Sequence, residues 1–321
     1  MKSKIFQIAE DASFRKFYRF ISNKKSKIIV YANKEKYKNL VAYTSINRFL
    51  RDNQILSPNL YTYNYQDGVI VLEDFGDITF YKVLVKQKNK LIIYKRLVDL
   101  LLKIQKIKTK TKIKNITKGS HKINKYSTRC LHKESDLFFD WYLPIYFKKK
   151  RVLSIKKKMK KILSKLYKSI NFPNSYFVHR DYHAQNLMKV GKRIGIIDSQ
   201  DALIGSPAYD LVSLIDDVRI KTSNKLKNEI YNYYIKKKSI MKKNELEFFL
   251  EDFNILSVQR SLKIIGIFSR IFKRDKKKQY LKLIPYAWKL LESRMSSEIF
   301  LDLKKILDKN IPKKIRNKII T

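Results

Sequence analysis

The N-terminal part of the chain consists of short runs of apolar, β-branched and aromatic residues, each bounded by turn residues. The runs form two pairs. Ser22 and Asn23 separate the first pair, and Asp67 and Gly68, a strong hairpin signal, separate the second. Between the pairs, apolar residues over 41–51 return at helical spacing. The pattern predicts a small, mostly antiparallel sheet with one helix. The predicted strands are 17–21, 27–31, 60–65 and 69–72.

After Gly76 the apolar residues keep returning to one face with a helical period, which predicts a mainly helical remainder. Two segments interrupt it. The basic stretch 106–125 predicts a structureless surface loop, and 176–198 returns to short β-prone runs around a polar loop. Pro285 predicts a stop inside the last helical region. The predicted helical regions are 91–104, 131–142, 152–170 and 208–307.

These elements predict an α+β fold of two lobes. We expect a small antiparallel β-rich lobe over 1–75 and a larger, mainly helical lobe over 76–321, with a hinge near 73–77. A chain of 321 residues can bury a sizeable core, and its 44% of hydrophobic residues excludes a disordered protein.

The charge of the chain is strongly positive, with a net value of +44. Of the 72 basic residues, 57 are lysine and 15 are arginine. Specific nucleic-acid binding usually relies on arginine, so this balance argues against it. Two interpretations stay open. AT-rich codon drift would raise lysine together with isoleucine, asparagine and tyrosine, whereas a functional surface would attract polyanions weakly and in a salt-sensitive way.

The sequence offers no apolar run long enough to cross a membrane and no pattern of a cleaved signal. Its single cysteine, Cys130, cannot form an internal disulfide and has no second cysteine with which to bind zinc. We therefore expect a protein of the reducing cytosol.

Two segments carry the candidate chemistry. The first, 178–187, contains the pattern H-R-D-x-x-x-x-N, in which D is Asp181 and N is Asn186. The second, 194–198, is an apolar strand that ends in Asp198. A loop of this length lets the Asp181 and Asn186 side chains face one cleft, and the strand returns Asp198 to the same place.

This spacing is typical of ATP-dependent phosphoryl transfer, in which the protein mainly positions groups and neutralises charge. Asp181 is the candidate catalytic base, which orients an acceptor hydroxyl. Asn186 and Asp198 are the candidate ligands of Mg²⁺, an ion that prefers oxygen donors and brings the phosphates of ATP with it. His179 is expected to brace the loop. The alternative is a polar loop whose Asp and Asn side chains only cap turns.

These segments resemble the aminoglycoside phosphotransferase and choline kinase family, relatives of protein kinases. The likeness is greater to one branch, bacterial anomeric kinases that phosphorylate N-acetylmuramate and N-acetylglucosamine for cell-wall recycling. The resemblance implies a bilobal protein-kinase-like fold, in which 1–75 binds nucleotide and 76–321 carries catalysis and acceptor binding. The matching segments are 11–19, 72–77, 134–141, 178–187, 198–211 and 259–268.

The resemblance also implies residues for each ligand. Segment 11–19 looks like the loop that covers the nucleotide, and the hinge looks like the place where backbone groups meet adenine. The implied cofactor-binding residues are Ser13, Arg15, Arg19, Glu73, Asp74 and Phe75. The implied acceptor-binding residues are Glu134, Trp141, Gln200 and Asp201.

The sequence departs from the kinase pattern in two ways. It has only seven glycines and no G-x-G-x-x-G loop. The strand 27–31 also lacks the lysine that kinases set against the α- and β-phosphates, and Tyr31 stands in its position. The resembled branch commonly lacks this lysine as well. Another cation should substitute for it, and Arg15 and Arg19 are the candidates.

Several residues near these motifs also have a structural interpretation. Phe138 and Trp141, three positions apart on a helix, can be core residues, and Glu134 can face solvent. The other structural expectations are that Tyr209 and Asp210 tie a helix start to the catalytic loop and that Asp216 and Asp217 form a solvated face.

The leading hypothesis is a small-molecule kinase that uses ATP and Mg²⁺ and acts on a small polar acceptor, by resemblance an amino sugar. A choline-type or aminoglycoside-type kinase is one alternative, although a cationic acceptor fits poorly with a chain that has only 28 acidic residues. A non-catalytic pseudokinase or polyanion-binding protein is the other, and the intact trio Asp181, Asn186 and Asp198 argues against it.

Overall fold

The computed structural model describes residues 3–8, 15–33, 36–238 and 243–319. It contains two compact units. The first unit comprises 1–125 and 175–204, and the second comprises 126–174 and 205–321. The predicted lobe boundary at residue 75 divides the chain differently and stays a prediction.

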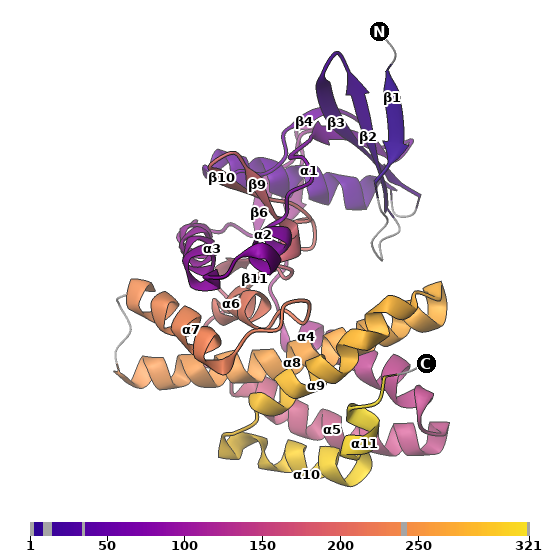
Figure 1. Cartoon of the computed structure of the whole chain (residues 1–321), viewed down its shortest axis with the longest axis vertical. Coiled ribbons are helices and arrows are strands. Elements are labelled where there is room, and N and C mark those ends of the chain that lie inside the picture. The colour runs from indigo at the N-terminus through magenta and orange to yellow at the C-terminus, as the bar shows by residue number, and fades with distance from the viewer. Residues whose placement is uncertain (1–2, 9–14, 34–35, 239–242, 320–321) are drawn as a thin grey trace. The chain divides into compact units, whose positions relative to one another are not determined.

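A five-stranded antiparallel sheet opens the first unit, and it confirms both predicted hairpins (Figure 1). Asn23 and Lys24 turn the first hairpin with φ of 49° and 60°. Gly68 turns the second with φ of 75°, a left-handed conformation that glycine adopts without a steric penalty. In spatial order the strands are β1 (Lys4–Gln7), β2 (Arg15–Ser22), β3 (Lys25–Ala32), β5 (Val69–Glu73) and β4 (Leu60–Asn64).

Helix α1 (Lys36–Asp52) contains the predicted helical stretch and lies against this sheet (Figure 1). Its apolar side and the inner side of the sheet share one buried cluster, which explains why a small sheet is stable here. The cluster consists of Val30, Ala32, Leu40, Val41, Tyr43, Tyr65, Ile70 and Leu72.

The rest of the first unit includes two helices and short strand pairs. The expectation of a structureless loop over 106–125 is wrong, because β6 (Lys112–Lys114) pairs with β7 (Ser120–Lys122). The apolar residues Ile113 and Ile123 are buried there, so two isolated apolar side chains suffice to order a lysine-rich stretch. The remaining elements are α2 (Phe80–Lys86), α3 (Lys90–Gln105), β8 (Tyr176–Val178), β9 (Leu187–Val190), β10 (Arg193–Ile196) and β11 (Leu203–Gly205).

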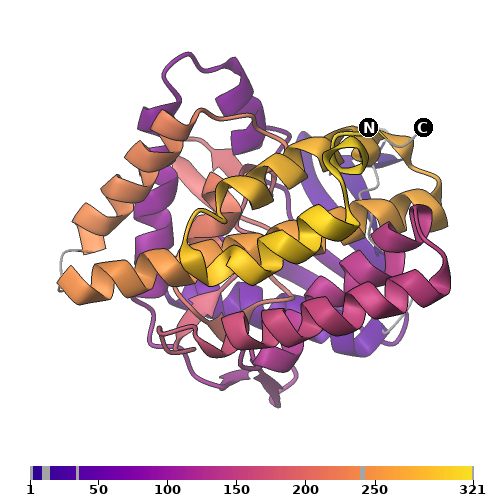
Figure 2. The same ribbon diagram turned by 90° about the horizontal axis from the view of Figure 1, so that it is seen from below.

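The second unit is built from helices around the long helix α8 (Lys243–Asp275). Figure 2 shows α10 lying along α5, and the two helices are in contact. These helices confirm the predicted helical character of this part of the chain. The others are α4 (Thr128–Leu137), α5 (Lys149–Lys168), α6 (Ala208–Ile215), α7 (Asn224–Lys238), α9 (Ile284–Ser293), α10 (Leu301–Asn310) and α11 (Lys313–Arg316).

Two details of these helices differ from the prediction. The helix expected over 131–142 is α-helical only to Leu137 and continues as a π-helix over 138–142. At this junction α8 passes very close, since a Cβ on Gly266 would lie 2.3 Å from the Leu137 carbonyl carbon. Pro285 does not end a helix. It stands in the first turn of α9, where its missing N–H costs nothing.

The expectation that Asp216 and Asp217 form a solvated face is wrong. Their exposed fractions are 3% and 4%. Lys227 Nζ lies 2.8 Å from Asp216 Oδ1, and Arg294 Nε lies 2.9 Å from Asp216 Oδ2. Burial alone would raise the pKa of Asp216, but these two cations hold it below its ordinary value. The buried ion pairs of Asp216 with Lys227 and Arg294 therefore connect the end of α6 to α7 and to the end of α9.

Among the described residues, we find no helix with the length and apolar character needed to span a bilayer.

Candidate active site

The candidate catalytic loop lies between β8 and β9 in the first unit. A short 3₁₀ turn, Ala184–Asn186, ends the loop, and the β9–β10 hairpin then leads to Asp198. The backbone N–H of Ile197 donates to the Asn186 carbonyl over 3.1 Å. This bond closes the hairpin at its base, so that Asn186 and the residue before Asp198 are held together.

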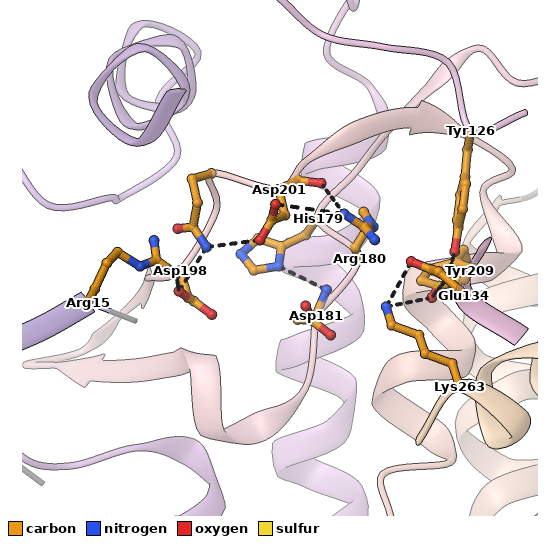
Figure 3. Close-up of polar contacts among 11 residues, drawn as sticks. Arg15, Tyr126, Glu134, His179, Arg180, Asp181, Asp198, Asp201, Tyr209 and Lys263 are labelled. Carbon is orange, nitrogen blue, oxygen red and sulfur yellow. Dashed lines mark hydrogen bonds and ion pairs between the residues drawn. The ribbon is translucent and has the colours of Figure 1, made fainter. Parts of the chain in front are cut away.

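His179 braces this loop, as the sequence predicts (Figure 3). The Asp181 backbone N–H donates to His179 Nδ1 over 3.3 Å, which leaves the ring proton on Nε2. Nε2 in turn contacts the Ile197 carbonyl at 3.0 Å. The buried ring therefore connects the backbone of the candidate base with the strand that delivers Asp198.

Two residues of this region have strained backbones. Arg180 has φ of 73° and Asp198 has φ of 63°. These values lie in the left-handed region, which residues other than glycine seldom adopt. Such strain concentrates at functional sites, where the surrounding structure enforces it. Here it turns Asp181 and Asp198 out of the regular hydrogen-bonded strands.

The carboxylates of Asp181 and Asp198 are close enough to interact electrostatically. Burial, opposed by Arg15 and reinforced by the negative charge of Asp181, raises the pKa of Asp198 above its ordinary value. Two neighbouring carboxylates of this kind are stabilised by a cation, so the site has the electrostatics of a metal-binding or cation-binding site.

The donor atoms fit Mg²⁺. Asn186 Nδ2 donates to the Asp181 carbonyl over 3.1 Å, which leaves the amide oxygen as the atom able to bind a metal. With the Asp198 carboxylate it makes an all-oxygen pair, as a hard ion requires, and phosphate oxygens and water complete such a shell in kinases. Across the described ranges, no group of three or more His, Cys, Asp or Glu side chains is placed to hold a metal.

The two arginines considered as substitutes for the missing lysine make different contacts. Arg15 begins β2 and is buried, and its Nη2 lies 3.1 Å from Asp198 Oδ1. Arg19 lies further along β2, with Nε 2.6 Å from Asp74 and Nη1 2.8 Å from Asp77. Arg15 therefore contacts the candidate metal ligand, whereas Arg19 is neutralised by the hinge. Ser13 lies outside the described residues.

The three hinge residues are held by local contacts. Glu73 Oε2 accepts from the Asn59 backbone N–H over 3.1 Å, and Asp74 Oδ1 accepts from the Gly76 N–H over 2.8 Å. The Phe75 ring lies so close to Gly195 that a Cβ there would be 2.6 Å from it. Their side chains thus fix the hinge, and recognition of adenine by its backbone stays a prediction.

Gln200 and Asp201 follow Asp198 closely in the sequence. Gln200 contacts Asp198, and Asp201 contacts Arg180 of the catalytic loop (Figure 3 labels Asp201 and Arg180). Gln200 Nε2 donates to Asp198 Oδ1 over 3.0 Å, and the Asp201 carbonyl accepts from Arg180 Nη1 over 3.2 Å. Gln200 is buried and Asp201 is exposed. Gln200 orients the candidate metal ligand, and the Asp201 carboxylate reaches solvent, where an acceptor could meet it.

Glu134 lies in the second unit inside a buried polar network, so its solvent-facing interpretation is wrong (Figure 3). Lys263 Nζ is 3.0 Å from Glu134 Oε1, and Gln259 Nε2 donates to Oε2 over 3.0 Å. The hydroxyls of Tyr126 and Tyr209 also donate to this carboxylate. No local sequence pattern predicts these partners, because they come from distant segments.

The two aromatic residues of the same segment differ. Phe138 is fully buried and packs on Trp288 and Tyr142, which confirms its core interpretation. Trp141 is only partly buried. An acceptor-binding role therefore stays a prediction for Trp141.

The sequence pattern did not single out two residues of α1: Tyr43, whose ring faces the Arg15 guanidinium, and Asn47, which contacts Ser199. Ser199 Oγ donates to Asn47 Oδ1 over 2.8 Å. One signal was available: α1 carries polar residues, among them Thr44, Ser45 and Asn47, at positions that its apolar pattern places near the core.

Curated relatives of the chain are named N-acetylmuramate/N-acetylglucosamine kinase. The relative from Pseudomonas aeruginosa is 28% identical over 297 residues, which cover 92% of this chain and 84% of the relative. The relative from Caulobacter vibrioides is 25% identical over 283 residues, which cover 86% and 76%.

Solved structures show the fold. A Plasmodium vivax ethanolamine kinase superposes with a TM-score of 0.62 at 11% identity and covers 91% of this chain and 82% of its own. A spectinomycin phosphotransferase in complex with ADP and spectinomycin has a TM-score of 0.54 at 15% identity, with coverages of 97% and 93%. The predicted α+β, protein-kinase-like fold is confirmed.

The predicted resemblance is confirmed as well. Residues 4–241 match the family model described as the phosphotransferase enzyme family, and the chain, a small-molecule kinase, belongs to that family.

Proposed function

We propose that the protein transfers the γ-phosphoryl group of ATP to the anomeric hydroxyl of an amino sugar, N-acetylmuramate or N-acetylglucosamine, with Mg²⁺ as cofactor. The observation that carries this proposal is the Asp181–Asn186–Asp198 arrangement: two interacting carboxylates and an amide oxygen, held by His179 and by strained backbone. The names of the curated relatives support the choice of acceptor.

In the proposed reaction, Asp181 accepts a hydrogen bond from the acceptor hydroxyl and aims its oxygen at the γ-phosphorus. The bond between that oxygen and phosphorus forms as the bond to the β-phosphate oxygen breaks, ADP leaves, and the hydroxyl proton passes to Asp181. Asn186 and Asp198 would hold Mg²⁺, which supplies positive charge to the phosphate oxygens when bound.

The nucleotide would lie against the first unit. Arg15 is the proposed cation for the α- and β-phosphates, and the backbone of Glu73, Asp74 and Phe75 is proposed to meet adenine. Arg19 supports this arrangement by fixing the hinge through Asp74 and Asp77. Ser13 is proposed to contact the phosphates.

The acceptor contacts are proposed from position and chemistry. Asp201, exposed beside the catalytic loop, is proposed to bind a sugar hydroxyl, and Gln200 to orient Asp198. Glu134 and Trp141 are kept as acceptor residues on family likeness alone. In the cell, such a reaction would recycle cell-wall amino sugars in the cytosol.

The test is transfer from labelled ATP in the presence of Mg²⁺, with wild type and Asp181→Asn side by side. The acceptors are N-acetylmuramate, N-acetylglucosamine, its methyl glycoside, choline and an aminoglycoside. We expect transfer to the free sugars only, because the methyl glycoside has no anomeric hydroxyl. Equal transfer to the methyl glycoside would exclude the anomeric position, and transfer to choline or the aminoglycoside alone would replace the amino sugar as acceptor.

A further inference from the structure

Among the described residues, β3 and α1 do not supply the lysine–glutamate pair by which protein kinases hold a cation over the nucleotide phosphates. The lysines of β3 are Lys25 and Lys27, at its exposed beginning. The sequence of α1, the helix packed on the sheet, has one acidic residue, Asp52, which is the last residue of the helix. A cation that faces the phosphates must therefore be held by something other than a carboxylate of α1.

Arg15 is the described cation that best fits this position, and its guanidinium packs against an aromatic ring of α1. Its guanidinium carbon lies 5.6 Å from the centroid of the Tyr43 ring, within the range of a cation–π interaction. The exposed fractions of Arg15 and Tyr43 are 7% and 3%, so water weakens this contact little. The other end of the guanidinium contacts Asp198 Oδ1 at 3.1 Å.

The segment that Arg15 faces is also held from α1. The Tyr43 hydroxyl lies near Asp198, and burial together with the negative charge of Asp198 raises the pKa of Tyr43 to about 12. Four residues later, and so on the same face of α1, Asn47 Oδ1 accepts the hydrogen bond of Ser199 Oγ. The strained backbone at Asp198, with φ of 63°, is thus held from α1 through the neighbouring Ser199.

We propose that Tyr43 takes the place of the missing glutamate: it is a positioning residue that orients Arg15 toward the nucleotide phosphates. This inference rests on the proposed nucleotide-binding function of the site. Its physical basis is that a ring face orients a guanidinium and adds no formal negative charge beside it. When Asp198 binds Mg²⁺, Tyr43 would still hold Arg15 in place.

The experiment measures binding of ADP by calorimetry, once with Mg²⁺ and once with EDTA, together with the KM values for ATP and for the acceptor. Tyr43→Leu removes ring and hydroxyl, Tyr43→Phe keeps the ring, and Arg15→Ala removes the cation. We expect Tyr43→Leu to raise the Kd for ADP about tenfold in both conditions and Tyr43→Phe to raise it about twofold. In the Arg15→Ala background, Tyr43→Leu should change the Kd less than about twofold.

The acceptor KM should stay unchanged in all these variants, which a general loss of structure would not allow. Equal effects of Tyr43→Leu with and without Arg15 would overturn the proposal. If Tyr43→Leu does not fold, Arg15→Ala decides, because an unchanged Kd for ADP would exclude Arg15 as the phosphate cation. Nucleotide binding without transfer to any sugar would refute only the proposed acceptor. No nucleotide binding by wild type would refute both the function and this inference.

Discussion

Arg15 Nη2 lies 3.1 Å from Asp198 Oδ1, although 183 positions separate the two residues in the sequence. The contact joins the first residue of β2 to the end of the hairpin that carries the proposed metal ligand. It gives the sheet a direct connection to the catalytic segment within the first unit, and it identifies which of two candidate arginines faces the proposed phosphate site.

Asp181→Asn should lower kcat by about 10²–10⁴-fold, because the amide cannot take the proton of the acceptor hydroxyl. Binding of ADP should change little, since the side chain is nearly the same size and is not proposed to hold the nucleotide. Steady-state kinetics and calorimetry measure the two effects. The matched control is Asp52→Asn, at the exposed end of α1, which should keep the wild-type rate. A kcat within about threefold of wild type would exclude Asp181 as the base.

Asp198→Asn should raise the Mg²⁺ concentration that gives half-maximal activity, by about tenfold or more, since one carboxylate ligand becomes neutral. Asparagine is the suitable replacement because it tolerates the left-handed backbone of this position better than alanine. The measurement is activity, and separately ADP affinity, across a Mg²⁺ titration.

Removal of the metal with EDTA should abolish turnover of the wild type and be reversed by added Mg²⁺. An unchanged Mg²⁺ requirement in Asp198→Asn would contradict the assignment of this residue as a ligand. The matched variant Asp67→Asn removes an exposed carboxylate of the β4–β5 turn and should leave the Mg²⁺ requirement unchanged.

Lys263→Met should lower the free energy of unfolding by about 3–5 kcal/mol, because it leaves the buried Glu134 carboxylate without its cation. The double variant Glu134→Gln with Lys263→Met should be more stable than Lys263→Met alone, since no charge is then left buried. Urea unfolding followed by circular dichroism measures both.

The single variant Glu134→Gln tests the acceptor role of Glu134. If Glu134 binds sugar, Glu134→Gln should raise the acceptor KM at a temperature at which the protein is folded. An unchanged acceptor KM would assign Glu134 to the buried network only.

Gly266→Ala should destabilise the second unit by about 1–3 kcal/mol or more, because the new methyl group would overlap the backbone at Leu137. Thermal unfolding measures the change. Glu247→Ala, an exposed change on the same helix, should stay within about 0.5 kcal/mol of wild type. Equal stability of the two variants would mean that α8 can shift away from the α4 junction without cost.

Local pattern predicted those parts of the structure that local forces decide. The alternation around Asp67–Gly68 predicted a hairpin because turn and strands are neighbours in the sequence. The spacing of Asp181, Asn186 and Asp198 was informative for the same reason, since one loop and one hairpin connect them. The Arg15–Asp198 and Asn47–Ser199 contacts, in contrast, join residues far apart in the sequence, and no local pattern predicts them.

The errors have the same origin. Two adjacent acidic residues, Asp216 and Asp217, have the pattern of a solvated surface, and only the folded chain brings Lys227 and Arg294 against Asp216. Glu134 shows this again, since its partners lie as far away as Lys263. Burial of a charge depends on partners that periodicity cannot reveal.

The close contacts at Gly195 and Gly266 also bear on how this chain can change over time. The sequence has only seven glycines in 321 residues. If AT-rich codon drift accounts for the lysine excess, the same drift would exchange glycine wherever a larger side chain can be accommodated. At these two positions any side chain would meet the Phe75 ring or the Leu137 backbone. They therefore set a lower limit to the glycine content of the chain, whatever the nucleotide composition of its genome.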